Sequence, residues 1–163
     1  MIVLGIDPGA ARCGYGVVLC RRSRLAALDG GVVSTGADVP LEARLERIYT
    51  RVRDLIALHR PAAVAIEDLF FGHNVRTAFA VGQARGAALL AAGQAGVPCS
   101  SYTPQAIKHA VCGSGAASKE QVQRMVGALL SLPAPPAPDH AADALAVAIC
   151  HANGAPVREA IPA

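Results

Sequence analysis

Runs of consecutive apolar residues in the first part of the chain predict buried strands. Residues 2–7 form one such run, and residues 14–20 form a second after a glycine-containing turn. A third strand is expected within residues 25–34, and a fourth apolar run covers residues 63–67. Because the first three segments follow each other closely, an antiparallel meander is their most economical arrangement.

Apolar residues at helical spacing predict a long helix between Pro40 and Pro61, where the two prolines favour its start and its end. Further helices are expected near residues 75–93, 103–112, 119–130 and 140–152, with a short strand near 97–101. Ser118 and Gln121 have the spacing of a capping box at the start of one of these helices. Strands that alternate with helices after a meander indicate an α/β layer fold.

Composition narrows the class of protein. Hydrophobic residues make up 53% of the 163 residues and charged residues 17%, which favours one folded domain over residues 1–152 and a loose tail over 153–163. No segment has the length and apolar character of a membrane span, and no basic segment precedes the first apolar run. Five scattered cysteines without a Cys-x-x-Cys pair favour reduced thiols and a cytoplasmic location.

Potential metal ligands stand at the ends of two of the predicted strands and on the last predicted helix. Asp7 ends the first apolar run and Glu67 ends the fourth, while His140 and Asp143 lie three residues apart on the helix. A carboxylate at the end of a buried strand is costly unless a cation meets it. The pattern therefore predicts a divalent metal site of the kind that supports phosphodiester chemistry. A net charge of +3 would also leave the remaining surface more basic than the total suggests.

Five short segments, in this order and spacing, resemble the RuvC family of Holliday junction resolvases. They are Gly5-Ile6-Asp7-Pro8-Gly9, Gly14-Tyr15-Gly16, Ala65-Ile66-Glu67, Gly82-Gln83-Ala84-Arg85-Gly86 and Ala142-Asp143-Ala144-Leu145-Ala146. The resemblance implies a ribonuclease-H-like α/β fold with a mixed five-stranded sheet flanked by helices. It also implies a homodimer that cuts four-way DNA junctions by paired symmetric nicks in recombination and repair. The implied cofactors are two divalent ions per subunit, Mg²⁺ or Mn²⁺, and the implied protein partners are RuvA and RuvB.

By this resemblance, Asp7, Glu67, His140 and Asp143 are the catalytic metal ligands. His140 is a departure, because many members carry an Asp three residues before the final Asp. Helical spacing alone would also allow Asp139, although its position after a Pro-rich stretch makes it a good helix cap. A nitrogen ligand in place of a carboxylate should favour Mn²⁺ relative to Mg²⁺.

The resemblance also implies DNA contacts. Phe70 would stack against bases at the junction centre, although an aromatic at this position could also belong to the core. Lys108, Lys119 and, more weakly, Arg76 would contact DNA, or be ordinary surface cations. The helix that carries Gly82 and Gly86 would border the dimer interface, because small residues allow another helix to approach closely.

Other interpretations of the sequence remain open. Asp7 before Pro8 and Gly9 could be a turn residue that bonds its own backbone. The chain could be a catalytically silent junction-binding module, which His140 in the place of an acid would favour. It could also be a ribonuclease-H-like nuclease that acts on RNA–DNA hybrids, or a fragment of a phosphotransferase that binds ATP.

Overall fold

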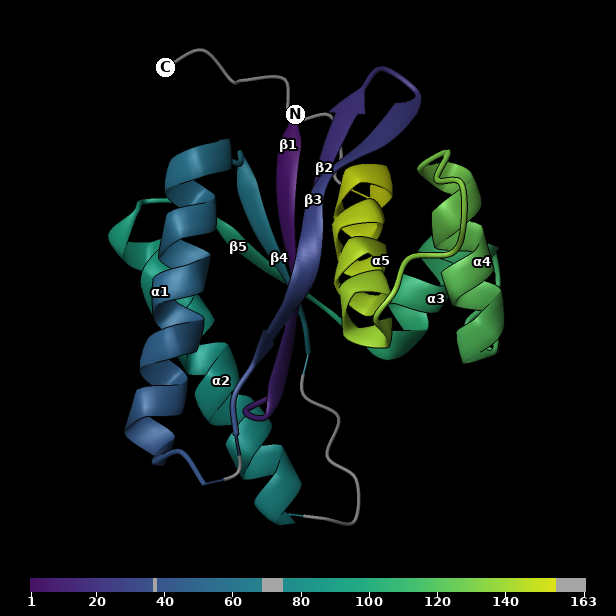
Figure 1. Ribbon diagram of the computed structural model, residues 1–163. Coiled ribbons are helices and arrows are strands. Elements are labelled where there is room, and N and C mark those ends of the chain that lie inside the picture. The colour runs from purple at the N-terminus through teal and green to yellow at the C-terminus, as the bar shows by residue number, and fades with distance from the viewer. Residues whose placement is uncertain (37, 69–74, 155–163) are drawn as a thin grey trace.

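The computed structural model describes residues 1–36, 38–68 and 75–154, and it shows a five-stranded mixed sheet between two layers of helices (Figure 1). The strands are β1 (Ile2–Asp7), β2 (Arg12–Arg21), β3 (Arg24–Ser34), β4 (Ala63–Glu67) and β5 (Cys99–Tyr102). Their order across the sheet is β3-β2-β1-β4-β5. The first three strands pair antiparallel, and β4 and β5 add parallel pairs beyond β1. The α/β class, the meander and the five-stranded mixed sheet are therefore confirmed.

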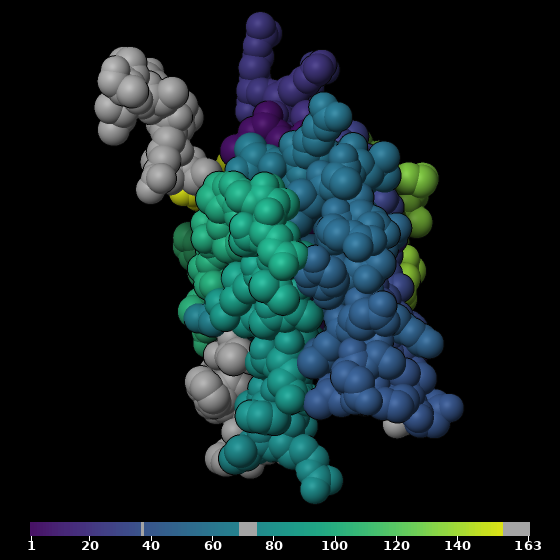
Figure 2. Space-filling model, turned by 90° about the vertical axis from the view of Figure 1, so that its left-hand side faces the viewer, coloured from purple at the N-terminus to yellow at the C-terminus, as the bar shows by residue number. Residues whose placement is uncertain are grey.

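The helices divide between the two faces of the sheet. They are α1 (Leu41–His59), α2 (Val75–Gln94), α3 (Pro104–Cys112), α4 (Lys119–Leu129) and α5 (Asp139–Gly154). Helices α1 and α2 lie side by side over one face, where Figure 2 shows them as neighbouring blue and teal columns. Helix α5 covers the other face, with α3 and α4 packed behind it. Helix α5 is therefore an inner helix and is buried along most of its length.

Alternation along the central strands assigns each side chain to one of two cores. Leu4 and Ile6 of β1 pack with α1 and α2, whereas Val3 packs with α5. In β4, Val64 and Ile66 belong to the first core and Ala65 to the second. Because side chains alternate along a strand, the terminal residues of β1 and β4 belong to the face that carries α5.

Glycines on the central strands allow α5 to lie directly against the sheet. An added Cβ at Gly5 would overlap the carbonyl oxygen of Ala144, and one at Gly14 would overlap the carbonyl oxygen of His140. The register pairs Gly5 with Gly16 and Asp7 with Gly14, so this glycine surface extends to the end of β1. The start of α5 is thereby held beside Asp7.

The predicted elements agree with the observed ones to within a few residues at their ends. The capping box of Ser118 and Gln121 is confirmed at the start of α4. Helix α5 runs to Gly154, and the rest of the predicted tail, residues 155–163, lies outside the described residues, as does Phe70. Within the part of the chain that the structure describes, no helix is long and apolar enough to cross a membrane.

Candidate metal centre

Two carboxylates meet at the ends of adjacent parallel strands. Residue Ile6 of β1 pairs with Ile66 of β4, so the residues that follow them, Asp7 and Glu67, lie side by side. Both belong to the face that α5 covers. The side chain of Asp7 is only 15% exposed, so its charge is largely removed from water. The strand ends therefore concentrate negative charge in a poorly hydrated place.

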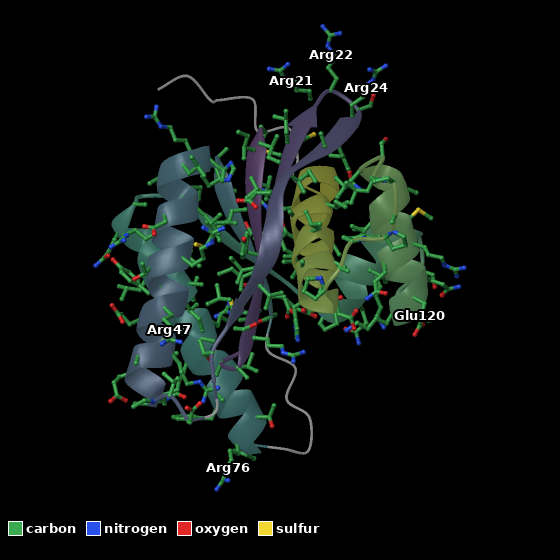
Figure 3. The ribbon with its side chains drawn as sticks, viewed as in Figure 1. Arg21, Arg22, Arg24, Arg47, Arg76 and Glu120 are labelled. Carbon is green, nitrogen blue, oxygen red and sulfur yellow. The ribbon has the colours of Figure 1, made fainter. Side chains whose placement is uncertain are left out.

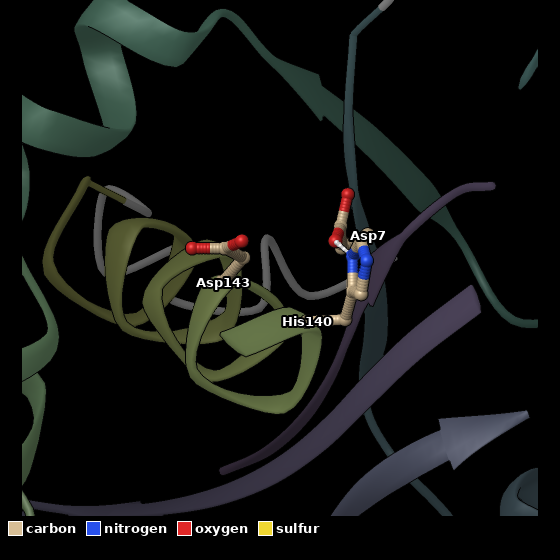
Figure 4. Close-up of side chains that lie close together, drawn as sticks. All are labelled: Asp7, His140 and Asp143. Carbon is tan, nitrogen blue, oxygen red and sulfur yellow. Dashed lines mark hydrogen bonds and ion pairs between the residues drawn. The ribbon is translucent and has the colours of Figure 1, made fainter. Parts of the chain in front are cut away.

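The first turn of α5 adds two further potential ligands. Nδ1 of His140 lies 2.7 Å from Oδ2 of Asp7, and Figure 4 shows the imidazole turned towards that carboxylate. Asp143, one turn further along α5, presents its carboxylate to the same space. One ligand atom each from Asp7, His140 and Asp143 lies within 4.8 Å of the others, as the ligands of one cation would.

Burial and mutual repulsion raise the pKa of the carboxyl groups in this cluster. Burial, and after it the charges of Asp7 and Asp143 and a hydrogen bond with Asp7, together raise the pKa of Glu67 to about 7. The pKa of Asp143 is also raised, first by burial and then by the charge of Asp7. Neighbouring carboxyl groups with raised pKa values are expected at a site that binds a cation, because the cation would offset their repulsion.

Lys119 supplies part of that positive charge. Its Nζ lies 3.4 Å from Oδ2 of Asp143 and 3.3 Å from Oδ2 of Asp139. Asp139 also accepts a hydrogen bond of 2.9 Å from Nε2 of Gln123. Lys119 and Gln123 both lie on α4, so these contacts tie the start of α5 to α4. Asp139 is the first residue of α5 and faces α4, whereas the sequence suggested a helix cap.

A cavity of about 230 Å³ adjoins the cluster. Glu67, Asp143 and Lys119 line it, together with Lys108 of α3 and a few apolar residues of α3, α4 and α5. Lys108 acts against the shift of Glu67, because its positive charge lowers the pKa of that carboxyl. The cavity is thus lined by two carboxyl groups and two lysines. This combination suits an anionic group bound next to a cation.

The donor set fits a hard or borderline divalent metal. Carboxylate oxygens are the ligands that Mg²⁺ and Mn²⁺ prefer, and an imidazole nitrogen suits Mn²⁺ better than Mg²⁺. Asp7, His140 and Asp143 would hold such an ion, and Glu67 lies close enough to influence it through its charge. A cation at this position would also relieve the mutual repulsion of the carboxylates.

Most of the residues singled out in the sequence lie at this centre. Asp7, Glu67, His140, Asp143, Lys108 and Lys119 are brought together. Arg76 is not, since it is exposed on the first turn of α2 and points away from the body of the protein in Figure 3. Asp68, which strand alternation assigned to the opposite face from Glu67, lies 3.8 Å from Arg85 of α2.

Some functional contacts had no clear signal in the sequence. The pairing of Lys119 with Asp139 and Asp143 depends on how α4 packs beside α5, and no local motif specifies that packing. The close approach of Gly14 to His140 was also not visible in the sequence. The two glycines of the Gly-Tyr-Gly pattern indicate space on one face of the strand, but not which helix fills it.

The fold defines a class, the proteins with a ribonuclease-H-like fold. The yeast mitochondrial Holliday junction resolvase has the same fold at 13% identity, with a TM-score of 0.63 over 93% of this chain and 78% of that chain. Within the class, the structure of RuvC from Thermus thermophilus is far more similar. It shares 44% identity, with a TM-score of 0.89 over 95% of each chain.

Sequence comparison identifies the family. Residues 3–151 match the family described as crossover junction endodeoxyribonuclease RuvC. The RuvC of Moorella thermoacetica is 52% identical over 159 residues, which cover 98% of this chain and 95% of that protein. The RuvC of Heliobacterium modesticaldum is 52% identical over 153 residues, which cover 94% of each. This chain therefore belongs to the RuvC family of crossover junction endodeoxyribonucleases.

Proposed function

We propose that this chain resolves four-way DNA junctions by nicking two strands symmetrically, and that each cut leaves a 5′-phosphate and a 3′-hydroxyl. The observation that carries the proposal is the convergence of Asp7, Glu67, His140 and Asp143 at one end of the sheet in a chain of this family. A related structure with 44% identity and a TM-score of 0.91 is that of Thermus thermophilus RuvC in complex with a Holliday junction substrate.

Divalent metal bound at these residues would supply a water of lowered pKa and neutralise charge on the phosphate. Two ions per subunit, Mg²⁺ or Mn²⁺, fit the number of ligands in the sequence. His140 and Asp7 orient each other through their hydrogen bond. Lys119 and Lys108 flank the cavity, where their ammonium groups would hold the phosphate of the scissile strand. Phe70 and Arg76 would also contact DNA.

A homodimer would place two such centres on one junction. Helix α2 supports this part of the proposal, because Val75, Phe79 and Leu90 are 79%, 68% and 56% exposed. Gly86 on the same helix is exposed, and an added Cβ there would meet nothing within 4 Å. These four residues recur at intervals of four and seven, so they share one face of the helix. An apolar face with a gap at its centre would fit the same face of a second copy by two-fold symmetry.

The remaining assignments follow from the family. RuvA and RuvB would be the protein partners, and the cytoplasm would be the location, which the five free cysteines favour. Residues 1–152 would act as a single nuclease domain.

A nicking assay tests the proposed function. The substrates are an immobile four-way junction with a short homologous core, a linear duplex and an RNA–DNA hybrid, each in Mg²⁺ and in Mn²⁺. Paired symmetric nicks on the junction alone are expected. Junction binding without cuts in either metal would instead favour a catalytically silent module, for which His140 in an acid's place is the supporting observation. Cuts on the hybrid would favour a different nuclease of the same fold.

A further inference from the structure

A cluster of arginines occupies the end of the molecule opposite the metal centre. Arg21, Arg22 and Arg24 form the tip of the β2–β3 hairpin, and Arg60 follows the last turn of α1. All four are exposed. Figure 3 shows the three hairpin arginines projecting beyond the rest of the protein, and the tip forms the purple projections in Figure 2. We call these four residues the arginine end.

Strand register fixes the position of the arginine end. Ile2, the first residue of β1, pairs with Leu19 just before the hairpin tip, and its carbonyl accepts a hydrogen bond from Ala62 just after Arg60. Asp7 closes the same strand at its other end. The arginines therefore flank the start of the central strand, whereas the metal ligands gather at its finish.

The four arginines form no ion pair within the part of the chain that the structure describes. Within that part, Arg51, Arg53 and Arg85 are the arginines that pair with a carboxylate. Uncompensated like charges repel each other and weaken the folded state. A cluster whose members form no ion pair is thus more easily explained by an external anion.

Backbone conformation gives a second, independent observation. Arg22 has φ 54° in the hairpin turn, and Arg60 has φ 47° at the end of α1. Glycine or asparagine is favoured at both kinds of position, because a side chain in the left-handed region costs free energy. Two of the three non-glycine residues with positive φ in the described part of the chain are therefore arginines of this one cluster. Both side chains therefore stand at backbone positions that favour glycine.

We propose that the arginine end is a second DNA-binding surface, which holds the phosphate backbone of a duplex segment while the metal centre engages the junction. Guanidinium groups match phosphate with two parallel hydrogen bonds. A two-stranded antiparallel ribbon has a width that the major groove of DNA admits. The tip from Arg21 to Arg24 carries only arginines and one serine, whereas a stable contact with an acidic protein would need an apolar centre.

The test measures recruitment of a second duplex by the full-length protein. The protein is first saturated with unlabelled junction, and a fluorescent linear duplex that carries no junction is then added at low ionic strength. A ternary complex of protein, junction and duplex is expected. The variant R21S/R22G/R24S/R60G should bind the duplex at least tenfold more weakly, while junction cleavage in the same mixture is unchanged. A plot of the logarithm of the binding constant against the logarithm of the salt concentration has a negative slope. In the variant this slope should become less steep by roughly 2–4, at about 0.9 for each lost phosphate contact.

Two control variants separate charge from folding. R22G/R60G removes two charges at positions that favour glycine, so its melting temperature should equal or exceed that of the parent while duplex recruitment falls. R53S removes an arginine that is paired with Asp54 and should leave recruitment unchanged. Recruitment that persists in the fourfold variant would overturn the proposal, as would the absence of a ternary complex with the parent protein. In the latter case an acidic protein becomes the better partner. Loss of junction cleavage by the parent would contradict the proposed function instead.

Discussion

Nδ1 of His140 lies 2.7 Å from Oδ2 of Asp7, so the first turn of α5 and the end of β1 meet in a single hydrogen bond between two metal-competent side chains. This contact places a neutral or cationic ring where a carboxylate would otherwise repel Asp7. The metal centre therefore carries less negative charge than four carboxylates would give it, and its choice of metal should reflect that difference.

The substitution His140→Asp should shift the metal preference. An all-oxygen ligand set suits Mg²⁺, whereas nitrogen favours Mn²⁺, so the ratio of Mg²⁺-supported to Mn²⁺-supported junction cleavage should rise in the variant. A change of roughly tenfold corresponds to about 1.4 kcal/mol of differential stabilisation. Cleavage rates are measured across titrations of both metals, and His140→Ala serves as the control that removes the ligand without replacing it. An unchanged ratio in His140→Asp would show that residue 140 does not bind the ion.

Replacement of Asp7 by asparagine should abolish cleavage and preserve junction binding. The amide keeps the size of the side chain but removes the charge that holds the metal. Because metal activation contributes several kcal/mol and each 1.36 kcal/mol is tenfold in rate, a loss of roughly 10³-fold or more is expected. Asp68→Asn is the matched control, since Asp68 lies beside Glu67 in sequence but near Arg85 on the other face. Equal losses in both variants would remove the special role of Asp7.

Glu67 should make the stability of the metal-free protein depend on pH. Its pKa is raised from 4.5 to about 7 in the folded state, so the folded state favours the protonated form. The resulting stabilisation is present below pH 4.5 and is lost as the pH rises to about 7. Glu67→Gln cannot ionise, so at pH 8 it should be more stable than the parent by about 1–3 kcal/mol, given about 1.4 kcal/mol per pKa unit.

Denaturant unfolding in EDTA at pH 4.5 and pH 8 measures this difference. It should be small at pH 4.5 and large at pH 8, and added Mn²⁺ should reduce it, because a bound cation stabilises the ionised carboxylate of the parent. A difference that is independent of pH would mean that Glu67 is ionised normally in the fold.

Local patterns predicted the elements of this fold well, and long-range packing explains what they missed. The apolar run that ends at Asp7 and the helical spacing between Pro40 and Pro61 both depend on residues close in sequence, so they were visible without a structure. Whether Glu67 or Asp68 faces the centre followed from strand alternation combined with the family resemblance. The contacts of Lys119 depend on how α4 sits against α5, and no neighbouring residue encodes that arrangement.

The arginine end was also not predictable from local sequence alone. The sequence Arg21-Arg22-Ser23-Arg24 is visible as a basic segment, but Arg60 lies far from it along the chain. Only the pairing of β1 with β2 and the position of Ala62 bring the two together. The positive φ of Arg22 and Arg60, which makes the cluster unusual, is likewise a property of the fold and not of composition.

Phe79→Ser should weaken the proposed dimer. Phe79 is 68% exposed on the apolar face of α2, so a polar replacement removes buried area from the interface without opening a cavity in the core. Analytical ultracentrifugation should show a shift to monomer with little change in the thermal stability of the subunit. Leu58→Ser is the control, since Leu58 is 71% exposed on α1 and lies outside that face. If both variants dimerise like the parent, α2 is not the interface.

Gly5→Ala should destabilise the protein and disturb the metal centre, although Gly5 is no ligand. An added Cβ would overlap the carbonyl oxygen of Ala144 and the backbone nitrogen of Ala148, so α5 would have to move away from β1. Overpacking of this kind typically costs about 1–3 kcal/mol. Because His140 and Asp143 lie on the same helix, metal affinity should fall together with the free energy of unfolding.

Gly93→Ala is the matched control, since nothing lies within 4 Å of an added Cβ on α2 there. That variant should gain up to about 1 kcal/mol from helix propensity. Denaturant unfolding and Mn²⁺ titration of both variants measure the two effects. Full stability and metal affinity in Gly5→Ala would show that α5 does not depend on this close approach.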